Sequence, residues 1–162
     1  MSNARPSLGQ TAPDFTLPAA DGTPTNLAAL CEQRTVVLYF YPKDETAGCT
    51  VEACAFRDSY EDFVAAGAQV VGVSRDDQTS HQSFARGHRL PFILLSDLKG
   101  EVHDRYGIGK RMYVLPDRVT FVIDRGRVIR HEFSSMVNMR AHVTEALAVV
   151  RRLQADGPGA GR

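Results

Sequence analysis

Two cysteines near the middle of the chain, Cys49 and Cys54, are the residues best placed to do chemistry. An apolar run ends at Pro42, a polar loop follows, and from Cys49 onward the residues take up helical spacing. The first backbone N–H groups of a helix lack intrahelical partners and carry partial positive charge, which stabilises a thiolate. We therefore expect the pKa of Cys49 to lie below the value of about 8.5 for a free cysteine, which would make its sulfur a nucleophile. The alternative is that Cys49 is only a small buried apolar residue.

The two thiols begin on different sides of one predicted helix. On a helical wheel, the apolar residues within about 60° of Cys49 are Ala53, Phe56, Tyr60, Phe63 and Val64. Cys54 lies about 140° away, on the face that carries Asp58 and Glu61. The Cys-x4-Cys spacing matches neither the Cys-x-x-Cys of thioredoxin-type reductants nor a zinc half-site. The interpretation that remains is a pair of thiols that reduces peroxide.

The motifs around these cysteines resemble a known family. The pattern Pro42-x-x-x-Thr46-x-x-Cys49 is similar to the active-site signature of the peroxiredoxins. Residues 48–54 resemble the Q-type branch, also called bacterioferritin comigratory proteins. The resemblance covers nearly the whole chain and includes residues 12–17, 70–74 and 118–124.

Two positions depart from the Q-type pattern. Ala47 stands where this branch usually has proline, and the turn at 124–127 looks about one residue shorter than usual. Neither departure touches a reacting group, so we expect altered loop stiffness and hairpin shape without altered chemistry.

The resemblance implies a thiol peroxidase. The Cys49 thiolate would attack hydrogen peroxide or an organic hydroperoxide and become a sulfenic acid. Cys54 would then form an intramolecular disulfide with Cys49, and thioredoxin or a similar dithiol would reduce that disulfide. The family needs no metal and no organic cofactor for these steps.

Four further residues receive roles from the same resemblance. Arg118, in the pattern Arg118-x-Thr120-Phe121, would reach the thiolate. Together with the Thr46 hydroxyl and the N–H groups at the helix start, it would stabilise the charge that moves from sulfur to oxygen. Pro42 would shape and dry the wall of the pocket. Glu52, beside Cys49 on the helical wheel, is expected to hold Arg118 in place.

A second function from another class is a redox-responsive binding protein. In that case the pair of Cys49 and Cys54 would switch a surface without useful turnover. Such a switch would not need the peroxide-activating residues Pro42, Thr46 and Arg118, and all three are present. The sequence therefore favours the peroxidase.

Composition limits the class of protein further. The chain has 162 residues, with 19 Lys and Arg against 19 Asp and Glu, so it carries no net charge. This length suits one domain, which we place at residues 5–156 with a disordered tail at 157–162. A neutral chain has no overall attraction to nucleic acid or anionic membrane, so small neutral partners fit better. We expect a monomer or a weak homodimer.

Cysteine usage and hydropathy favour a cytoplasmic protein. Three cysteines are too few for a secreted disulfide scaffold and favour a reducing compartment. We find neither the basic start and apolar run of a signal peptide nor the roughly 18–20 apolar residues that span a bilayer. The expectation is a protein that neither crosses nor binds a membrane.

Other residues with chemical potential were weighed and set aside. The five histidines, at 81, 88, 103, 131 and 142, show no two-histidine spacing of a zinc site, so we expect packing or surface roles. Cys31 lacks an activating neighbour and is expected to be a small apolar residue. The segment 72–76 begins like a hydrolase elbow but lacks the second glycine. The basic clusters at 86–89 and 151–152 have no interleaved stacking aromatics, which argues against nucleic-acid binding.

The elements that must position Cys49 can be read from hydrophobic periodicity. Unbroken apolar runs at 36–41 and 69–74 predict buried strands, and the helix between them predicts a right-handed crossover and a parallel pair. The helix from Cys49 is expected to continue to Gly67. Turn signals at Asp21-Gly22 and at 124–126 predict two hairpins, an N-terminal one and one joining 119–123 to 128–133.

The remaining segments complete an α/β pattern. Helices are expected near 27–31 and 101–106, and another should follow the capping residues at 76–80 and end near Gly87. A short strand is expected at 92–95, and a last helix is capped by Asn138. The pattern predicts a mixed central sheet flanked by helices. The resemblance sharpens this to a thioredoxin-like fold with an N-terminal β-hairpin. The loop from Pro42 to Cys49 follows the carboxyl end of a strand, where α/β proteins place their sites.

Overall fold

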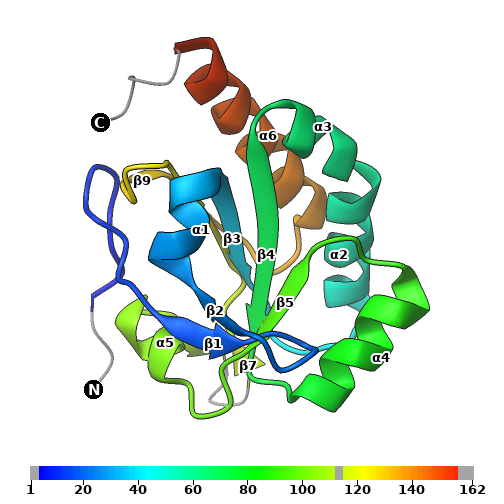
Figure 1. The fold of residues 1–162 in the computed structure, drawn as a ribbon. Coiled ribbons are helices and arrows are strands. Elements are labelled where there is room, and N and C mark those ends of the chain that lie inside the picture. The colour runs from blue at the N-terminus through cyan, green and yellow to red at the C-terminus, as the bar shows by residue number, and fades with distance from the viewer. Residues whose placement is uncertain (1–3, 112–114, 157–162) are drawn as a thin grey trace.

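A mixed five-stranded sheet, in the order β5-β4-β3-β8-β9, forms the centre of the protein (Figure 1). The structure is a computed structural model and describes residues 4–111 and 115–156. The predicted disordered tail, 157–162, lies outside the described residues. The strands are β1 (Thr16–Pro18), β2 (Pro24–Asn26), β3 (Thr35–Phe40), β4 (Ala68–Ser74), β5 (Ile93–Ser96), β6 (Lys110–Arg111), β7 (Leu115–Pro116), β8 (Val119–Ile123) and β9 (Ile129–Ser134). The helices are α1 (Leu27–Gln33), α2 (Ala47–Asp58), α3 (Tyr60–Ala65), α4 (Gln78–His88), α5 (Glu101–Arg105) and α6 (Met139–Asp156).

The parallel half of the sheet confirms the predicted strand–helix–strand unit. β3 pairs in parallel with β4, and β4 pairs in parallel with β5. Residues 36–40 of β3 are all buried, as expected for a central strand covered on both faces. β3 is the middle strand of the five, so its carboxyl end opens at the centre of one edge of the sheet.

The antiparallel half brings the end of the chain beside β3. β8 pairs antiparallel with both β3 and β9, and Phe40 at the end of β3 lies opposite Val119 near the start of β8. The predicted hairpin between β8 and β9 is confirmed. Because β8 pairs with β3, Arg118, which precedes β8, lies at the same sheet edge as the loop that begins at Pro42.

Helices cover both faces of the sheet in two separate cores. One core joins the sheet to α2, α3, α4 and α6, and the other joins it to α1 and α5 (Figure 1). Asn138 accepts a hydrogen bond from the backbone N–H of Ala141, which confirms its predicted capping of α6. The N-terminal hairpin is confirmed as the antiparallel pair β1 and β2.

The long helix predicted from Cys49 to Gly67 is wrong in one respect. The helix is interrupted at Ser59, which ends α2 and precedes α3. The backbone angles of Ser59 (φ −101°, ψ 5°) lie outside the helical region. The break changes the helical phase, so Phe63 is still fully buried whereas Val64 is 37% exposed. Val64 therefore does not belong to the apolar stripe that Cys49 begins.

Two details add to the predicted fold. The short antiparallel pair of β6 and β7 had no counterpart in the sequence analysis. Within the described ranges, no helix combines the length and apolarity that crossing a bilayer would need.

Candidate active site

Cys49 lies in the first turn of α2, directly beyond the carboxyl end of β3. Thr46 occupies the position before the helix, and its carbonyl accepts the first helical hydrogen bond, from the N–H of Thr50, at 2.9 Å. The expected helix start is thus present, two residues earlier than Cys49 itself. The Cys49 side chain is 1% exposed and belongs to the core that α2 shares with α6.

Arg118 connects Cys49 to Glu52. Its Nη1 atom donates to Cys49 Sγ at 3.5 Å and to Glu52 Oε1 at 2.6 Å. Glu52 is fully buried and Arg118 is 3% exposed, so the ion pair is shielded from solvent. The contact expected between Glu52 and Arg118 is present, and one guanidinium nitrogen serves both the thiol and the carboxylate.

Burial changes the protonation of these groups. Burial raises the pKa of Cys49 above its ordinary value, while Arg118, a backbone hydrogen bond from Lys43 and the Thr46 hydroxyl lower it and Glu52 raises it. The net lowering expected from the helix start is therefore wrong for this structure, because loss of solvent outweighs the local donors. Burial also raises the pKa of Glu52 to about 7, against the lowering by Arg118.

The loop before Cys49 holds the other two predicted residues. Pro42 is buried, and Thr46 is half-buried with its hydroxyl donating to the Lys43 carbonyl at 2.8 Å. This hydroxyl makes no capping hydrogen bond to α2. Arg118, Thr46 and Glu52 thus lie around the Cys49 sulfur, at the edge of the sheet where β3 ends. Pro42 is buried at the start of the same loop.

Gly48 leaves space for the guanidinium of Arg118 because it has no side chain. The sequence did not predict this role. A Cβ atom at this position would lie 2.9 Å from Arg118 Nη2 and 3.1 Å from the Met139 side chain. Both distances are too short for unstrained packing. A side chain at residue 48 would therefore displace the guanidinium from the thiol.

The other cysteines differ in exposure. Cys54 is half-buried in the same helix as Cys49, and all three cysteines are free thiols. Cys31 is 1% exposed on the opposite face of the sheet, and burial raises its pKa to about 12. The prediction that Cys31 is a small buried residue is confirmed.

His142, on α6, is a site residue that the sequence analysis missed. Its Nδ1 atom lies 3.6 Å from Glu52 Oε2 and 2.7 Å from the Thr120 hydroxyl, and its side chain is fully buried. The available signal was its place on the apolar stripe of the last helix, four residues before Ala146. A buried polar group on such a stripe needs a partner.

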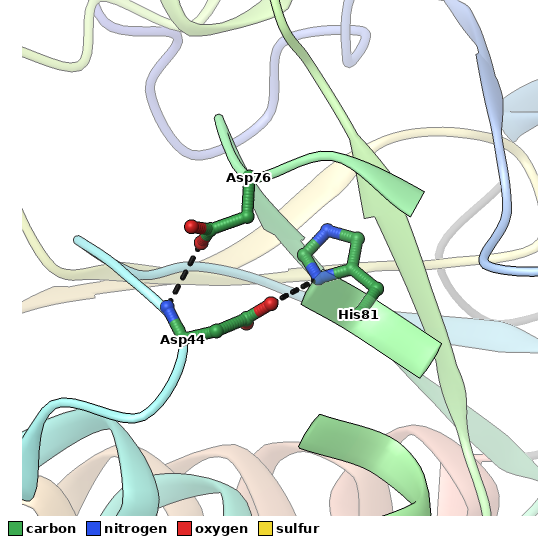
Figure 2. A group of neighbouring side chains, drawn as sticks. All are labelled: Asp44, Asp76 and His81. Atoms are coloured by element: carbon green, nitrogen blue, oxygen red, sulfur yellow. Dashed lines mark hydrogen bonds and ion pairs between the residues drawn. The ribbon is translucent and has the colours of Figure 1, made fainter. Parts of the chain in front are cut away.

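A second polar cluster fixes the loop between Pro42 and Thr46. Figure 2 shows Asp44, in the loop after β3, next to His81 of α4 and Asp76 of the loop after β4. Asp44 Oδ2 lies 2.7 Å from His81 Nδ1, and the Asp44 backbone N–H donates to Asp76 at 2.8 Å. The Tyr41 hydroxyl also donates to Asp44, at 2.6 Å.

The cluster of Asp44, Asp76 and His81 has the composition of a cation site, with ligand atoms within 4.8 Å of one another. Its atoms are, however, already engaged by protein groups. His81 Nε2 bonds to the Leu95 carbonyl at 3.0 Å, and the Ser74 hydroxyl donates to Asp76 at 2.6 Å. We therefore interpret the cluster as the anchor of the active-site loop.

A free cysteine in the first turn of a helix, beside a buried arginine–glutamate pair on an α/β scaffold, defines a thiol-dependent oxidoreductase. Comparison with known proteins narrows this class. The model of the AhpC/TSA family matches residues 8–132. Peroxiredoxin Q of Triticum aestivum is 43% identical over 148 residues, covering 91% of this chain and 68% of that protein. Peroxiredoxin Q of Arabidopsis thaliana is 44% identical over 149 residues, with the same two coverages.

Solved structures agree with the sequence relatives. Peroxidoxin BcpB of Mycobacterium tuberculosis superposes with a TM-score of 0.85 at 40% identity, covering 90% of this chain and 97% of that one. Peroxiredoxin Q of Xanthomonas campestris superposes with a TM-score of 0.79 at 32% identity, covering 86% and 91%. The chain therefore belongs to the AhpC/TSA family and, within it, is a peroxiredoxin of the Q type with the thioredoxin-like fold. The predicted family, fold class and enzyme class are confirmed.

Proposed function

We propose that Cys49 is the peroxidatic nucleophile, which reduces hydrogen peroxide and organic hydroperoxides. The thiolate attacks one peroxide oxygen, the O–O bond breaks, and water or an alcohol leaves after taking up a proton. The sulfur is oxidised to a sulfenic acid. The peroxide supplies the oxidising equivalents, so the step needs neither metal nor organic cofactor.

The observation that carries this proposal is the contact of Arg118 Nη1 with both Cys49 Sγ and Glu52 Oε1, at 3.5 and 2.6 Å. The ion pair with Glu52 fixes the guanidinium, so its charge already faces the sulfur before a substrate arrives. Donors fixed in this way stabilise the charge that develops in a transition state without reorganising. The Thr46 hydroxyl lowers the pKa of the same thiol. In this proposal the first N–H groups of α2 add to the stabilisation, and the buried Pro42 forms the wall of the pocket.

We further propose that Cys54 resolves the sulfenic acid. Its thiol attacks Cys49 Sγ, water leaves, and a disulfide joins the two residues. A dithiol protein of the thioredoxin kind then reduces this disulfide by exchange. Support comes from the position of Cys54 in the same helix, half-buried and free.

We also propose that the protein works in the cytoplasm, as a monomer or weak homodimer. The proposal for the compartment rests on the small number of cysteines and on the need for a dithiol donor. Size-exclusion chromatography with light scattering, on reduced and oxidised protein, tests the oligomeric state.

A coupled assay tests the proposed cycle. NADPH consumption is followed with thioredoxin reductase, thioredoxin, the protein and either hydrogen peroxide or cumene hydroperoxide. We expect turnover that depends on both peroxide and thioredoxin, and that is lost in Cys49→Ser. Cys31→Ser is the matched control, because it removes a buried thiol on the opposite face of the sheet. This variant should retain turnover. Absence of turnover with every hydroperoxide and dithiol donor would contradict the proposal and favour a redox switch.

A further inference from the structure

Behind the reactive thiol lies a buried chain of polar groups that reaches from α2 to α6. Glu52 Oε1 is bonded to Arg118, but Glu52 Oε2 has no hydrogen-bond partner among the described residues. This unpaired oxygen lies 3.6 Å from Nδ1 of His142. An unpaired carboxylate oxygen in a fully buried position is costly, so the arrangement calls for an explanation.

The hydrogen bonds of His142 determine which ring nitrogen carries the proton. Nε2 lies 2.8 Å from the Ser135 carbonyl, which can only accept, so the proton is on Nε2. Burial lowers the pKa of His142 to about 4, against a raising hydrogen bond to Ser135, so the ring is neutral at neutral pH. Nδ1 is then an acceptor, which the Thr120 hydroxyl occupies at 2.7 Å. The lone pair of Nδ1 thus faces an unpaired oxygen of Glu52.

We infer that Glu52 and His142 together hold one proton beside the reactive thiol, and that His142 is a positioning residue which controls when Arg118 is free to stabilise the Cys49 thiolate. This inference rests on the proposed function. With a proton on Oε2, Glu52 becomes a donor that faces Nδ1 of His142. The Thr120 hydroxyl then turns away from Nδ1, and Oε2 and Nδ1 close their 3.6 Å separation to hydrogen-bond distance, so the unpaired oxygen gains a partner.

Charge balance explains why the proton matters. A Glu52 carboxylate and a Cys49 thiolate would both depend on Nη1 of Arg118, and two anions against one buried cation leave an uncompensated charge. Ionisation of Cys49 is therefore coupled to protonation of Glu52. The net change is the transfer of one proton from Cys49 to Glu52, which gives a Cys49 thiolate and a neutral Glu52 carboxyl group. After the S–O bond has formed and the O–O bond has broken, the departing oxygen takes one proton and Glu52 returns to its carboxylate.

The surroundings of the pair contain few other charges. Glu52 is faced by Arg118 from the start of β8, by Tyr39 from β3 and by Cys49 on its own helix. His142 is faced by Arg118 and by His131 of β9, and both lower its pKa. Arg118 is thus the one cation that the Glu52 charge meets directly among these groups. When Glu52 is protonated, the charge of Arg118 is available to the Cys49 thiolate alone. When Glu52 is ionised, Arg118 is shared between the carboxylate and the thiolate.

The test is a titration of the Cys49 thiolate, followed by ultraviolet absorbance or alkylation rate in a Cys54→Ser background. His142→Gln can keep a donor for Ser135 while it removes Nδ1. Without that acceptor, the protonated form of Glu52 loses its partner, so the pKa of Glu52 falls. The Glu52 carboxylate then persists at lower pH than in the unmodified protein, and there it competes with the Cys49 thiolate for Arg118. We expect the thiolate midpoint to rise by about one pH unit, a roughly tenfold loss of thiolate below the midpoint.

A double-variant comparison separates this role from packing. In a Glu52→Gln background the carboxylate charge is absent, so adding His142→Gln should leave the thiolate midpoint unchanged. His103→Gln is the matched control: it alters a buried histidine, 4% exposed, that packs against Phe40 on the other face of the sheet, and it should not move the midpoint. A midpoint that His142→Gln leaves unchanged, or that it moves equally in both backgrounds, would overturn the inference.

A second measurement needs no substitution of His142. Infrared difference spectra of the reduced protein between about pH 6 and pH 8 should show a protonated carboxyl band that disappears in Glu52→Gln. Absence of that band at the lower pH would overturn the inference even if His142→Gln failed to fold. The titration and the spectra use no peroxide, so their outcome is independent of whether the protein turns over hydroperoxides.

Discussion

Cys49 and Cys54 lie five positions apart in one unbroken helix, α2, and both are free thiols. Positions five apart in an intact α-helix have Cα atoms about 8.7 Å apart. A disulfide requires Cα atoms within roughly 7 Å and Cβ vectors that face each other. The disulfide between these residues therefore cannot form on the helix as it stands.

The first prediction is that α2 unwinds from Cys49 to about Phe56 when the disulfide forms. Unwinding gives up helical hydrogen bonds at an end of the helix, where local opening costs least. Hydrogen exchange measured by mass spectrometry should show lower protection of residues 50–57 in the oxidised protein than in the reduced protein. Segment 143–150 of α6 serves as the internal reference. Equal protection of residues 50–57 in both forms would exclude the unwinding.

The second prediction concerns Arg118 and pH. Arg118→Ala removes a fixed donor from the transition state, so peroxide oxidation of Cys49 should slow by about 10²–10³-fold. Arg118 lowers the pKa of Cys49, so its removal should also move the rise of rate with pH to higher pH. Stopped-flow oxidation across pH measures both effects. Arg118→Lys should recover only part of the rate, because an ammonium lacks the planar fork of donors.

An unchanged rate and an unchanged thiolate titration in Arg118→Ala would remove Arg118 from the site. The unfolding midpoint of each variant, measured in parallel, separates a catalytic effect from a loss of folded protein.

The third prediction is that Gly48→Ala slows peroxide oxidation without unfolding the protein. The added Cβ would lie 2.9 Å from Arg118 Nη2, so the guanidinium must move away from the sulfur. Misplacement of a catalytic group by about 1 Å can cost up to about 100-fold in rate. Gly87→Ala is the matched control, because that glycine of α4 has nothing within 4 Å of an added Cβ. It should leave the oxidation rate unchanged, and a similar loss in both variants would refute the steric explanation.

The fourth prediction is that the hydrogen bond between His81 and Asp44 supports the active-site loop. His81→Gln can retain the bond to Leu95 while it removes the ring nitrogen that faces Asp44. Among the described residues, Asp44 Oδ2 would keep only the Ser80 hydroxyl as a partner. Loss of one buried hydrogen bond to a charged group should lower the free energy of unfolding by about 1.5–3 kcal/mol and should slow Cys49 oxidation. Denaturant unfolding and stopped-flow oxidation measure the two effects.

Glu45→Gln provides the control for the fourth prediction. It alters the more exposed pair between Glu45 of the same loop and His88 of α4, whose side chains are 59% and 28% exposed. An exposed pair contributes about 0–1 kcal/mol, so this variant should stay close to the unmodified protein. Equal destabilisation by both substitutions would show that the buried anchor has no special role.

Local periodicity predicted much of this architecture correctly. The parallel unit around β3, the hairpin from β8 to β9 and the cap at Asn138 all depend on signals within a few residues, and all three are present. Contact between Glu52 and Arg118 was also anticipated, although the residues are 66 positions apart, because the family motif fixes both. Pairing of β8 with β3 brings Arg118 to the site, and no local pattern specifies that pairing.

The failures have physical causes of a different kind. The pKa of Cys49 depends on how deeply the thiol is buried, which the packing of α2 against α6 determines and a helical wheel does not. The break at Ser59 had a visible signal, because Glu61 and Asp62 place acidic residues in the first turn of a new helix. His142 and His81 were missed because their partners, Glu52 and Asp44, are remote in the sequence.

The central claim is that Cys49 is the sulfur that peroxide oxidises. Its most direct test is single-turnover oxidation of Cys54→Ser with one equivalent of hydrogen peroxide in the presence of a sulfenic-acid trap, read by intact mass and peptide mapping. We predict one trapped adduct, located on Cys49 and absent from the Cys49→Ser variant. An adduct on Cys54 in the Cys49→Ser variant, formed as fast as the Cys49 adduct, or no adduct on Cys49 at all, would contradict the claim.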